Sequence, residues 1–173
     1  DEQKSSFIQN VANKKQLSVL TVFGLKEYES AKKSWNIGAI VEKPTIEEFL
    51  LLVKNCEFLI TDSHHGTCLG ILFKKNYFAI GNKKRGIDRF ITVAEKLGTL
   101  DRIISLPVNE KLVDQLPEID YADVEIRLNQ EVDRAKSWLE MAFNKESIPG
   151  EETVYTLLRR IEKLEEQVRK LQG

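Results

Sequence analysis

EFLITDSHHGTCLGILF, residues 57–73, passes from a strand pattern to a helix pattern within a few positions. Residues 57–61 are apolar on nearly every position, as in a parallel strand that is buried on both faces. Residues 67–73 carry a second apolar run that fits a helix, and the polar loop 62–66 separates the two. A strand followed closely by a helix is typical of an open α/β sheet, in which ligands bind at the carboxyl ends of the strands.

The same alternation continues on both sides of this stretch. We expect further strands at residues 17–23 and 77–80, a short strand at 101–106, and helices near 7–12, 45–53, 86–97 and 122–145. Thr45 and Glu48 have the spacing of a capping box, and Gly98 marks a helix end. The long helix should place Val124, Ile126, Val132, Ala135, Leu139 and Ala142 on its inner side.

The order of these elements predicts an α/β fold with a Rossmann-like, open, mostly parallel sheet and helices on both faces. Such a domain normally begins with a strand, whereas this chain begins with a helical pattern. We therefore expect a first strand to precede Asp1.

The last part of the chain has a different sequence pattern. A Pro-Gly turn at residues 149–150 separates a domain at residues 1–146 from a heptad segment at 151–173. In that segment β-branched residues at every a position alternate with leucine at every d position, at Val154, Leu157, Ile161, Leu164, Val168 and Leu171. This combination favours a parallel two-stranded coiled coil, so we expect a homodimer through residues 152–172. The alternative is a helix that folds back on its own domain.

Composition excludes several classes of protein. The chain has 173 residues and a formal net charge of −1, so no global field draws it to nucleic acid. No apolar run approaches the ~20 residues of a transmembrane segment, and the first residues are too polar for a signal peptide. Cys56 and Cys68 lack metal-site spacing, and we expect no bound metal and a reducing compartment. The expected location is cytoplasmic, either free or peripheral at the inner face of the membrane.

The loop at residues 62–66 is the first candidate site. It combines Asp62, Ser63, both histidines of the protein and Gly66, just before a helix N-terminus that favours an anion such as phosphate or carboxylate. Histidine exchanges protons near neutral pH, and His65 is the preferred candidate, with His64 as its neighbour. The alternative is that Asp62 and Ser63 only cap the helix.

A second cluster follows the next strand. Four cations lie within residues 83–89, around Gly86 and again before a helix. They fit either a solvated rim or a clamp for an anionic substrate. Arg85 and Arg89 are favoured over the lysines because a guanidinium group binds phosphate or carboxylate with two parallel hydrogen bonds.

These motifs resemble the polysaccharide pyruvyl transferase family. The resemblance covers residues 5–145 and rests on PTIEEF (44–49), KNCEFLITDSHHGT (54–67), FKKNYF (73–78), RGIDRF (85–90) and LGTLDRII (97–104). His64 departs from the pattern, since the family usually has an aromatic or apolar residue there.

The resemblance implies a two-domain enzyme with a glycosyltransferase-B-like fold, of which this chain is the C-terminal, donor-binding half. Family members transfer the enolpyruvyl group of phosphoenolpyruvate to a sugar of a cell-surface polysaccharide or its lipid-linked precursor, and form a pyruvate ketal. Phosphoenolpyruvate is a co-substrate, and no other cofactor is implied. The resemblance assigns His65 as the catalytic proton donor and gives a substrate-binding set of Asp62, Ser63, His64, Gly66, Thr67, Arg85, Gly86 and Arg89.

Because the resemblance covers one half of such an enzyme, we expect the chain alone not to turn over. Two other functions remain open. One is a glycosyltransferase that uses a nucleotide-sugar, and the other is a non-catalytic α/β domain with a coiled-coil tether. Binding of phosphoenolpyruvate, of a nucleotide-sugar or of neither separates the three.

Overall fold

The computed structural model describes residues 2–24, 28–81, 86–107 and 117–143. By its internal contacts the chain divides into two units, Asp1–Leu128 and Asn129–Gly173. The first unit holds the sheets and the sequence motifs. The predicted coiled coil at 151–173 lies outside the described residues, as does Arg85.

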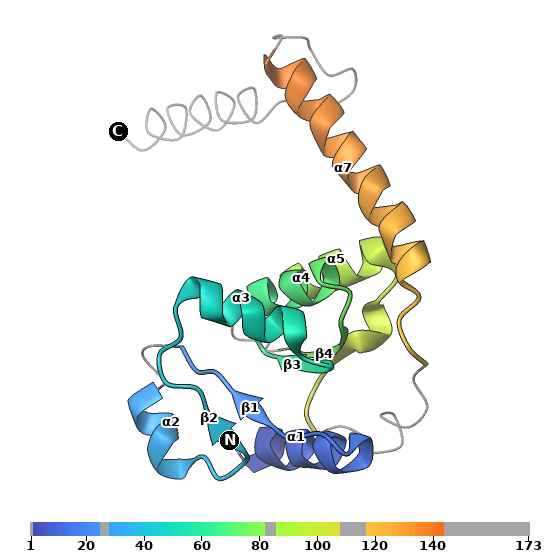
Figure 1. The fold of residues 1–173 in the computed structure, drawn as a ribbon. Helices are drawn as coiled ribbons and strands as arrows, with labels where there is room; N and C mark the ends of the chain where they lie inside the picture. Colours follow the sequence, from blue (N-terminus) through green and yellow to red (C-terminus); the bar gives the residue numbers. More distant parts are fainter. Residues whose placement is uncertain (1, 25–27, 82–85, 108–116, 144–173) are drawn as a thin grey trace, which may run out of the picture. The chain divides into compact units, whose positions relative to one another are not determined.

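A parallel three-stranded sheet forms the centre of the first unit (Figure 1). Its order is β3 (Phe58–Thr61), β4 (Asn76–Ile80), β5 (Ile103–Ile104), with β4 in the middle. Ile60 of β3 pairs with Phe78 of β4. The predicted strands at 57–61, 77–80 and 101–106 are therefore confirmed, the last as a two-residue strand.

Helices cover both faces of this sheet. Along β4 the side chains of Tyr77 and Ala79 pack into one core cluster, with Ile71, Phe90, Leu97 and Val124. Those of Phe78 and Ile80 pack into the other cluster, with Phe7, Val11 and Ile104. Successive side chains of a strand point to opposite faces, so this alternation explains why the strand is apolar at every position from Tyr77 to Ile80.

Three helices lie on the face of Tyr77. They are α3 (Ile46–Asn55), α4 (His64–Leu72) and α5 (Asp88–Leu97). The predicted capping box is present, because Thr45 accepts from the Glu48 amide and Glu48 accepts from the Thr45 amide. Gly98 ends α5 with φ of 72°, a left-handed conformation that glycine adopts without strain. The 3-10 turn η2 (Leu100–Arg102) then leads into β5.

On the opposite face lies α1 (Glu2–Lys15), whose Phe7 ring meets Phe78 edge-on at 5.8 Å. Lys4 and Lys15 lie at its two ends. Lys4 contacts Asp62, directly after β3, and the Lys15 ammonium lies 4.9 Å from the ring of Phe58, the first residue of β3. The helix therefore runs antiparallel to β3 and spans its whole length.

The predicted strand at 17–23 is wrong in length and burial. The structure has only β1 (Leu20–Thr21) there, paired with β2 (Ala39–Ile40) in a separate parallel two-stranded sheet. Leu20 is 62% exposed, so this strand is not buried on both faces as predicted. Between the two strands lies α2 (Tyr28–Ser34).

The long helix α7 (Tyr121–Phe143) confirms the helix that was predicted at residues 122–145, as far as residue 143, where the described residues end. Its predicted inner side is wrong beyond the first turn. Val124 is buried against α5 and the sheet, whereas Ile126 is 59% and Leu139 is 46% exposed. Tyr121 fixes the start of the helix, because its hydroxyl donates to the Lys75 carbonyl at 2.6 Å.

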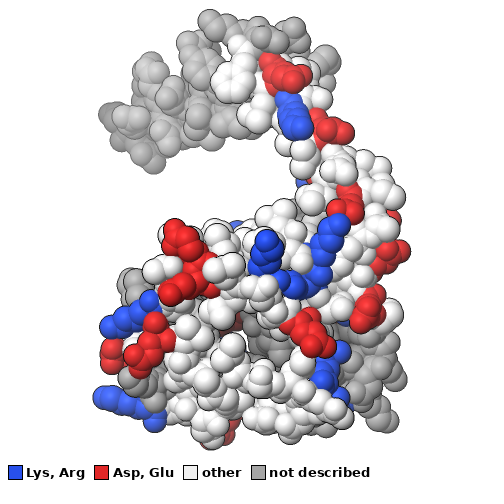
Figure 2. Space-filling view, in the orientation of Figure 1, with Lys and Arg blue, Asp and Glu red and all other residues white. Residues whose placement is uncertain are grey.

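Within the described part of the chain, none of the helices has the length and apolar character that a membrane crossing needs. Basic and acidic side chains are both spread over the face drawn in Figure 2, rather than gathered into one field of a single sign.

Candidate functional site

The turn from β3 into α4 is fixed by its own hydroxyl groups. The Ser63 amide donates to Thr61 Oγ1 at 3.1 Å, and Ser63 Oγ accepts from the Gly66 amide at 3.4 Å. Ser63 is thus the N-cap of α4, which confirms the capping interpretation for this residue. Because the cap satisfies the first turn, the helix begins at His64, and both histidines lie on the helix rather than in a preceding loop.

Gly66 allows the helix to pass close to the strand that precedes it. A Cβ atom at position 66 would lie 2.3 Å from Thr61 Oγ1, so a larger residue would force the turn to shift. The next residue, Thr67, is fully buried, and its hydroxyl donates to the Ser63 carbonyl at 3.1 Å. Gly66 and Thr67 therefore hold the geometry of the turn.

The two histidines have different surroundings. His65 is exposed at the first turn of α4. The ring of His64 is half-buried and meets the Phe90 ring of α5 edge-on at 5.7 Å, and its Nε2 lies 3.8 Å from Cys68 Sγ. In the described part of the chain its buried Nδ1 has no hydrogen-bond partner.

The charges around His64 affect its protonation. Burial, and then the positive charges of Arg89 and His65, lower the pKa of His64. His64 is therefore a neutral imidazole near pH 7. His65 is the exposed ring of the two, so a molecule above α4 can reach it.

Arg89 lies in the first turn of α5 and folds over Gly86. A Cβ atom at position 86 would lie 3.5 Å from Arg89 Nε, and Gly86 itself has φ of 78°. Phe90, the next residue of α5, contacts the His64 ring at 5.7 Å, and the charge of Arg89 contributes to the lowered pKa of His64. The structure thus brings the first turn of α4, with His64 and His65, next to the first turn of α5, which carries Arg89 and follows Gly86.

Lys4 is the charged group at this edge that the sequence analysis missed. Its Nζ lies 2.8 Å from Asp62 Oδ2, although 58 positions separate the two residues. The signal was present only in the periodicity of α1, where Lys4 shares one face with Phe7 and Val11, both of which are buried. Lys4 adds a cation beside the candidate site.

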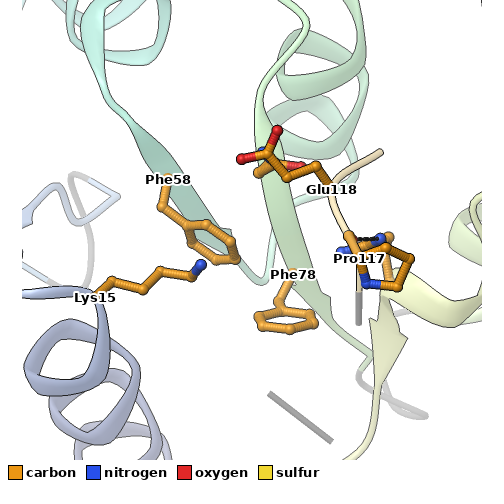
Figure 3. Close-up of a pocket in the computed structure, with 7 residues that line it drawn as sticks. Lys15, Phe58, Phe78, Pro117 and Glu118 are labelled. Carbon is orange, nitrogen blue, oxygen red and sulfur yellow. Dashed lines mark hydrogen bonds between the residues drawn. The ribbon is translucent and has the colours of Figure 1, made fainter. Parts of the chain in front are cut away.

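A small cavity lies at the opposite edge of the sheet (Figure 3). It has a volume of about 30 Å³ and is lined by Lys15, Phe58, Asn76, Phe78, Arg102, Pro117 and Glu118. Phe58 and Asn76 are the first residues of β3 and β4, so the cavity is at the amino ends of the strands. It has room for about one or two water molecules and is too small for a substrate with two charged groups.

The cavity has a structural role at that edge. The buried guanidinium group of Arg102 contacts the Asp101 carboxylate at 3.3 Å and donates to the Pro117 carbonyl. The Asn76 side chain accepts from the Ile119 amide at 2.9 Å. These contacts join the segment before α7 to the sheet. The carboxyl edge, with Lys4, His65 and Arg89, is the better candidate for chemistry.

Among the described residues there is no group of three or more histidine, cysteine, aspartate or glutamate side chains that could hold a metal ion. The free thiols of Cys56 and Cys68 are half-buried. Burial raises the pKa of both, which keeps them protonated and weakly nucleophilic near neutral pH.

Comparison with known proteins tests the resemblance. Neither the curated proteins nor the solved structures contain a match to this chain. A family model described as "Polysaccharide pyruvyl transferase" matches residues 2–84, a range that includes the Asp62–Thr67 turn and ends before Arg85. The match confirms, over residues 2–84, the resemblance that the motifs carry, and the family that it names is one of transferases.

Proposed function

We propose that this chain is the C-terminal, donor-binding domain of a glycosyltransferase-B-like polysaccharide pyruvyl transferase. Its donor is phosphoenolpyruvate, which binds at the carboxyl edge of the sheet. The acceptor is a sugar of a cell-surface polysaccharide or of its lipid-linked precursor, and the product is a pyruvate ketal. One observation carries this proposal: the exposed His65 lies in the first turn of α4, and that turn packs through His64 against Phe90, the residue after Arg89 in α5.

The charges at this edge suit a small dianion. Phosphoenolpyruvate has a carboxylate and a phosphate, and Arg89 offers a planar pair of donors for either group. The N-terminus of α4 has no acidic residue in its first turn, so its dipole favours an anion there. Lys4 supplies a further positive charge, held in place by Asp62. Arg85 and Gly86 belong to the same proposed binding set.

In the proposed reaction, protonated His65 gives its proton to the methylene carbon of phosphoenolpyruvate, which becomes a methyl group. Positive charge develops on the adjacent carbon, and one sugar hydroxyl forms a bond to that carbon. Phosphate leaves with the C–O bonding pair, and a second hydroxyl forms the other bond of the ketal. One hydroxyl proton returns to His65, and the other goes to the departing phosphate or to solvent.

The neighbouring residues support this step without exchanging protons themselves. His64 stays neutral, so it does not compete with His65 as the acid, and its packing on Phe90 joins α4 to α5. Ser63, Gly66 and Thr67 fix the first turn of α4 that carries His65. Positioning and charge stabilisation of this kind supply much of the barrier reduction in many enzymes.

Isothermal titration calorimetry on the 173-residue chain tests the proposal. Phosphoenolpyruvate should bind in the micromolar to millimolar range, and Arg89→Ala should weaken it by ~10-fold or more, as expected for loss of a charge-assisted bidentate contact. Lys54→Ala, an exposed cation at the end of α3, is the matched control and should leave binding unchanged.

The same titration distinguishes the alternatives. Binding of a nucleotide-sugar instead of phosphoenolpyruvate would favour a glycosyltransferase. Binding of neither would favour a non-catalytic domain. Either outcome contradicts the proposed donor.

A further inference from the structure

The second half of α7 has an apolar stripe that faces solvent. Residues 129–143 belong to the second unit of the chain. Val132, Ala135, Leu139 and Ala142 follow one another at intervals of three, four and three residues, so they lie along one side of the helix. Val132 is 39% exposed, Leu139 is 46% exposed, and Trp138 beside them is 46% exposed. Apolar side chains that are aligned and exposed on one side of a helix offer a surface to an apolar partner.

We propose that a second copy of this chain covers the stripe, with residues 129–143 of the two α7 helices paired side by side in parallel. In this arrangement Val132 and Leu139 are at a positions, and Ala135 and Ala142 are at d positions. The small d residues let the helices approach closely at those layers. The proposal does not depend on the function of the carboxyl edge.

Charge complementarity selects the second copy and the parallel orientation. In this register Glu131, which lies 3.4 Å from Arg134 of its own helix, is at a g position, and Lys136 is at the following e position. A parallel pair places each g residue beside the e residue of the partner helix five positions later, so glutamate meets lysine on both sides. An antiparallel pair would instead place g beside g and e beside e, and would lose these two attractions. Figure 2 shows acidic and basic side chains flanking uncharged surface along α7.

The sequence beyond α7 supports the same partner. Thirty residues follow Phe143, and they include the heptads from Val154 to Leu171 with β-branched a positions and leucine d positions. This composition favours two parallel strands, and Arg160 and Glu165 again have opposite charges at g and e positions. A segment of two heptads is marginal alone. The sequence patterns of the two segments thus favour the same partner and the same orientation.

A cysteine cross-linking experiment on the full chain tests the pairing of α7 directly. Val132→Cys would place two thiols across the a layer of a parallel pair, within the Cα separation of 4.4–6.8 Å that a disulfide needs. Ser137→Cys is the matched control, because Ser137 is exposed on the opposite side of the helix. Native Cys56 and Cys68 are present in both variants, so their contribution cancels. Covalent dimer should form at least ~10-fold faster for Val132→Cys than for Ser137→Cys.

A mass measurement gives the second readout. Sedimentation equilibrium of the unmodified chain should show a dimer. Leu139→Glu, which buries two carboxylates in the interface, should weaken dimerisation by at least ~30-fold, whereas Ser137→Glu should not. A monomer at all concentrations would overturn the proposal, and would fit a tail that folds onto α7 of its own chain. A dimer that is indifferent to Leu139→Glu, with equal cross-linking of both cysteine variants, would overturn it as well.

Discussion

The ammonium group of Lys4 lies 2.8 Å from the carboxylate of Asp62, which joins the first turn of α1 to the end of β3 across the edge of the sheet. Both side chains are partly exposed, at 26% and 44%. An exposed pair of this kind contributes only about 0–1 kcal/mol to stability. Because Asp62 directly precedes the turn that carries His65, we propose that Lys4 acts in binding rather than in folding.

Lys4→Met should therefore weaken phosphoenolpyruvate binding by ~5-fold, while the free energy of unfolding changes by less than about 1 kcal/mol. Calorimetry and urea denaturation of the same samples measure both quantities. Equal affinities in Lys4→Met and the unmodified chain would exclude Lys4 from the site.

His65→Ala removes the proposed acid and should lower turnover at least ~100-fold in the enzyme that contains both domains. The side chain is exposed, so the variant should unfold at the same denaturant concentration as the parent. A steady-state assay of phosphate release gives the rate. Near-normal turnover in this variant would refute the catalytic role.

Gly66→Ala should destabilise the domain by about 2 kcal/mol, because the new Cβ would overlap Thr61 Oγ1 at 2.3 Å. Removing that oxygen should relieve the overlap, so Thr61→Ala combined with Gly66→Ala should recover part of the loss. A double-mutant cycle in urea measures the coupling. Strict additivity of the two single changes would show that the close approach of α4 to β3 is not what requires glycine.

The stability of the fold should depend on pH through His64. Its pKa is lower in the folded chain, so the unfolded chain binds the proton more tightly. Stability from this group is complete above the unfolded value of about 6.5 and declines as the pH falls through that value toward the folded pKa. Urea denaturation between pH 7.5 and 5.5 should show the decline.

The matched variant for this effect is His64→Phe, which keeps an aromatic ring against Phe90 and cannot titrate. Its denaturation midpoint should vary less with pH than that of the unmodified chain over the same interval. An unchanged pH dependence would show that another group is responsible.

The central strands could be predicted from the sequence because β3 and β4 are covered on both faces, which makes their side chains apolar at consecutive positions. The same rule failed at residues 17–23, where an apolar run forms only the short strand β1 with Leu20 exposed. The local amino-acid composition of a strand does not indicate whether helices cover both of its faces. Capping motifs were more reliable, since Thr45 with Glu48 and Ser63 with Gly66 act within three residues.

The candidate site, too, could be predicted only in part. The turn at Asp62–Thr67 could be found because strand end, polar residues and helix start are adjacent in the chain. Lys4 could not, because its place at the edge depends on how α1 packs against Phe78. The exposed stripe of α7 has the periodicity of a buried face, and no local signal distinguishes a core from an interface with another molecule.

The most direct test of the donor site is a titration of the isotopically labelled chain with phosphoenolpyruvate, followed by amide chemical shifts in NMR spectra. The account predicts that the largest changes fall on Ser63, His65, Gly66 and Arg89, with small changes at Phe58, Asn76 and Glu118 around the cavity of the opposite edge. Shifts concentrated at the opposite edge, or none at millimolar phosphoenolpyruvate, would contradict it.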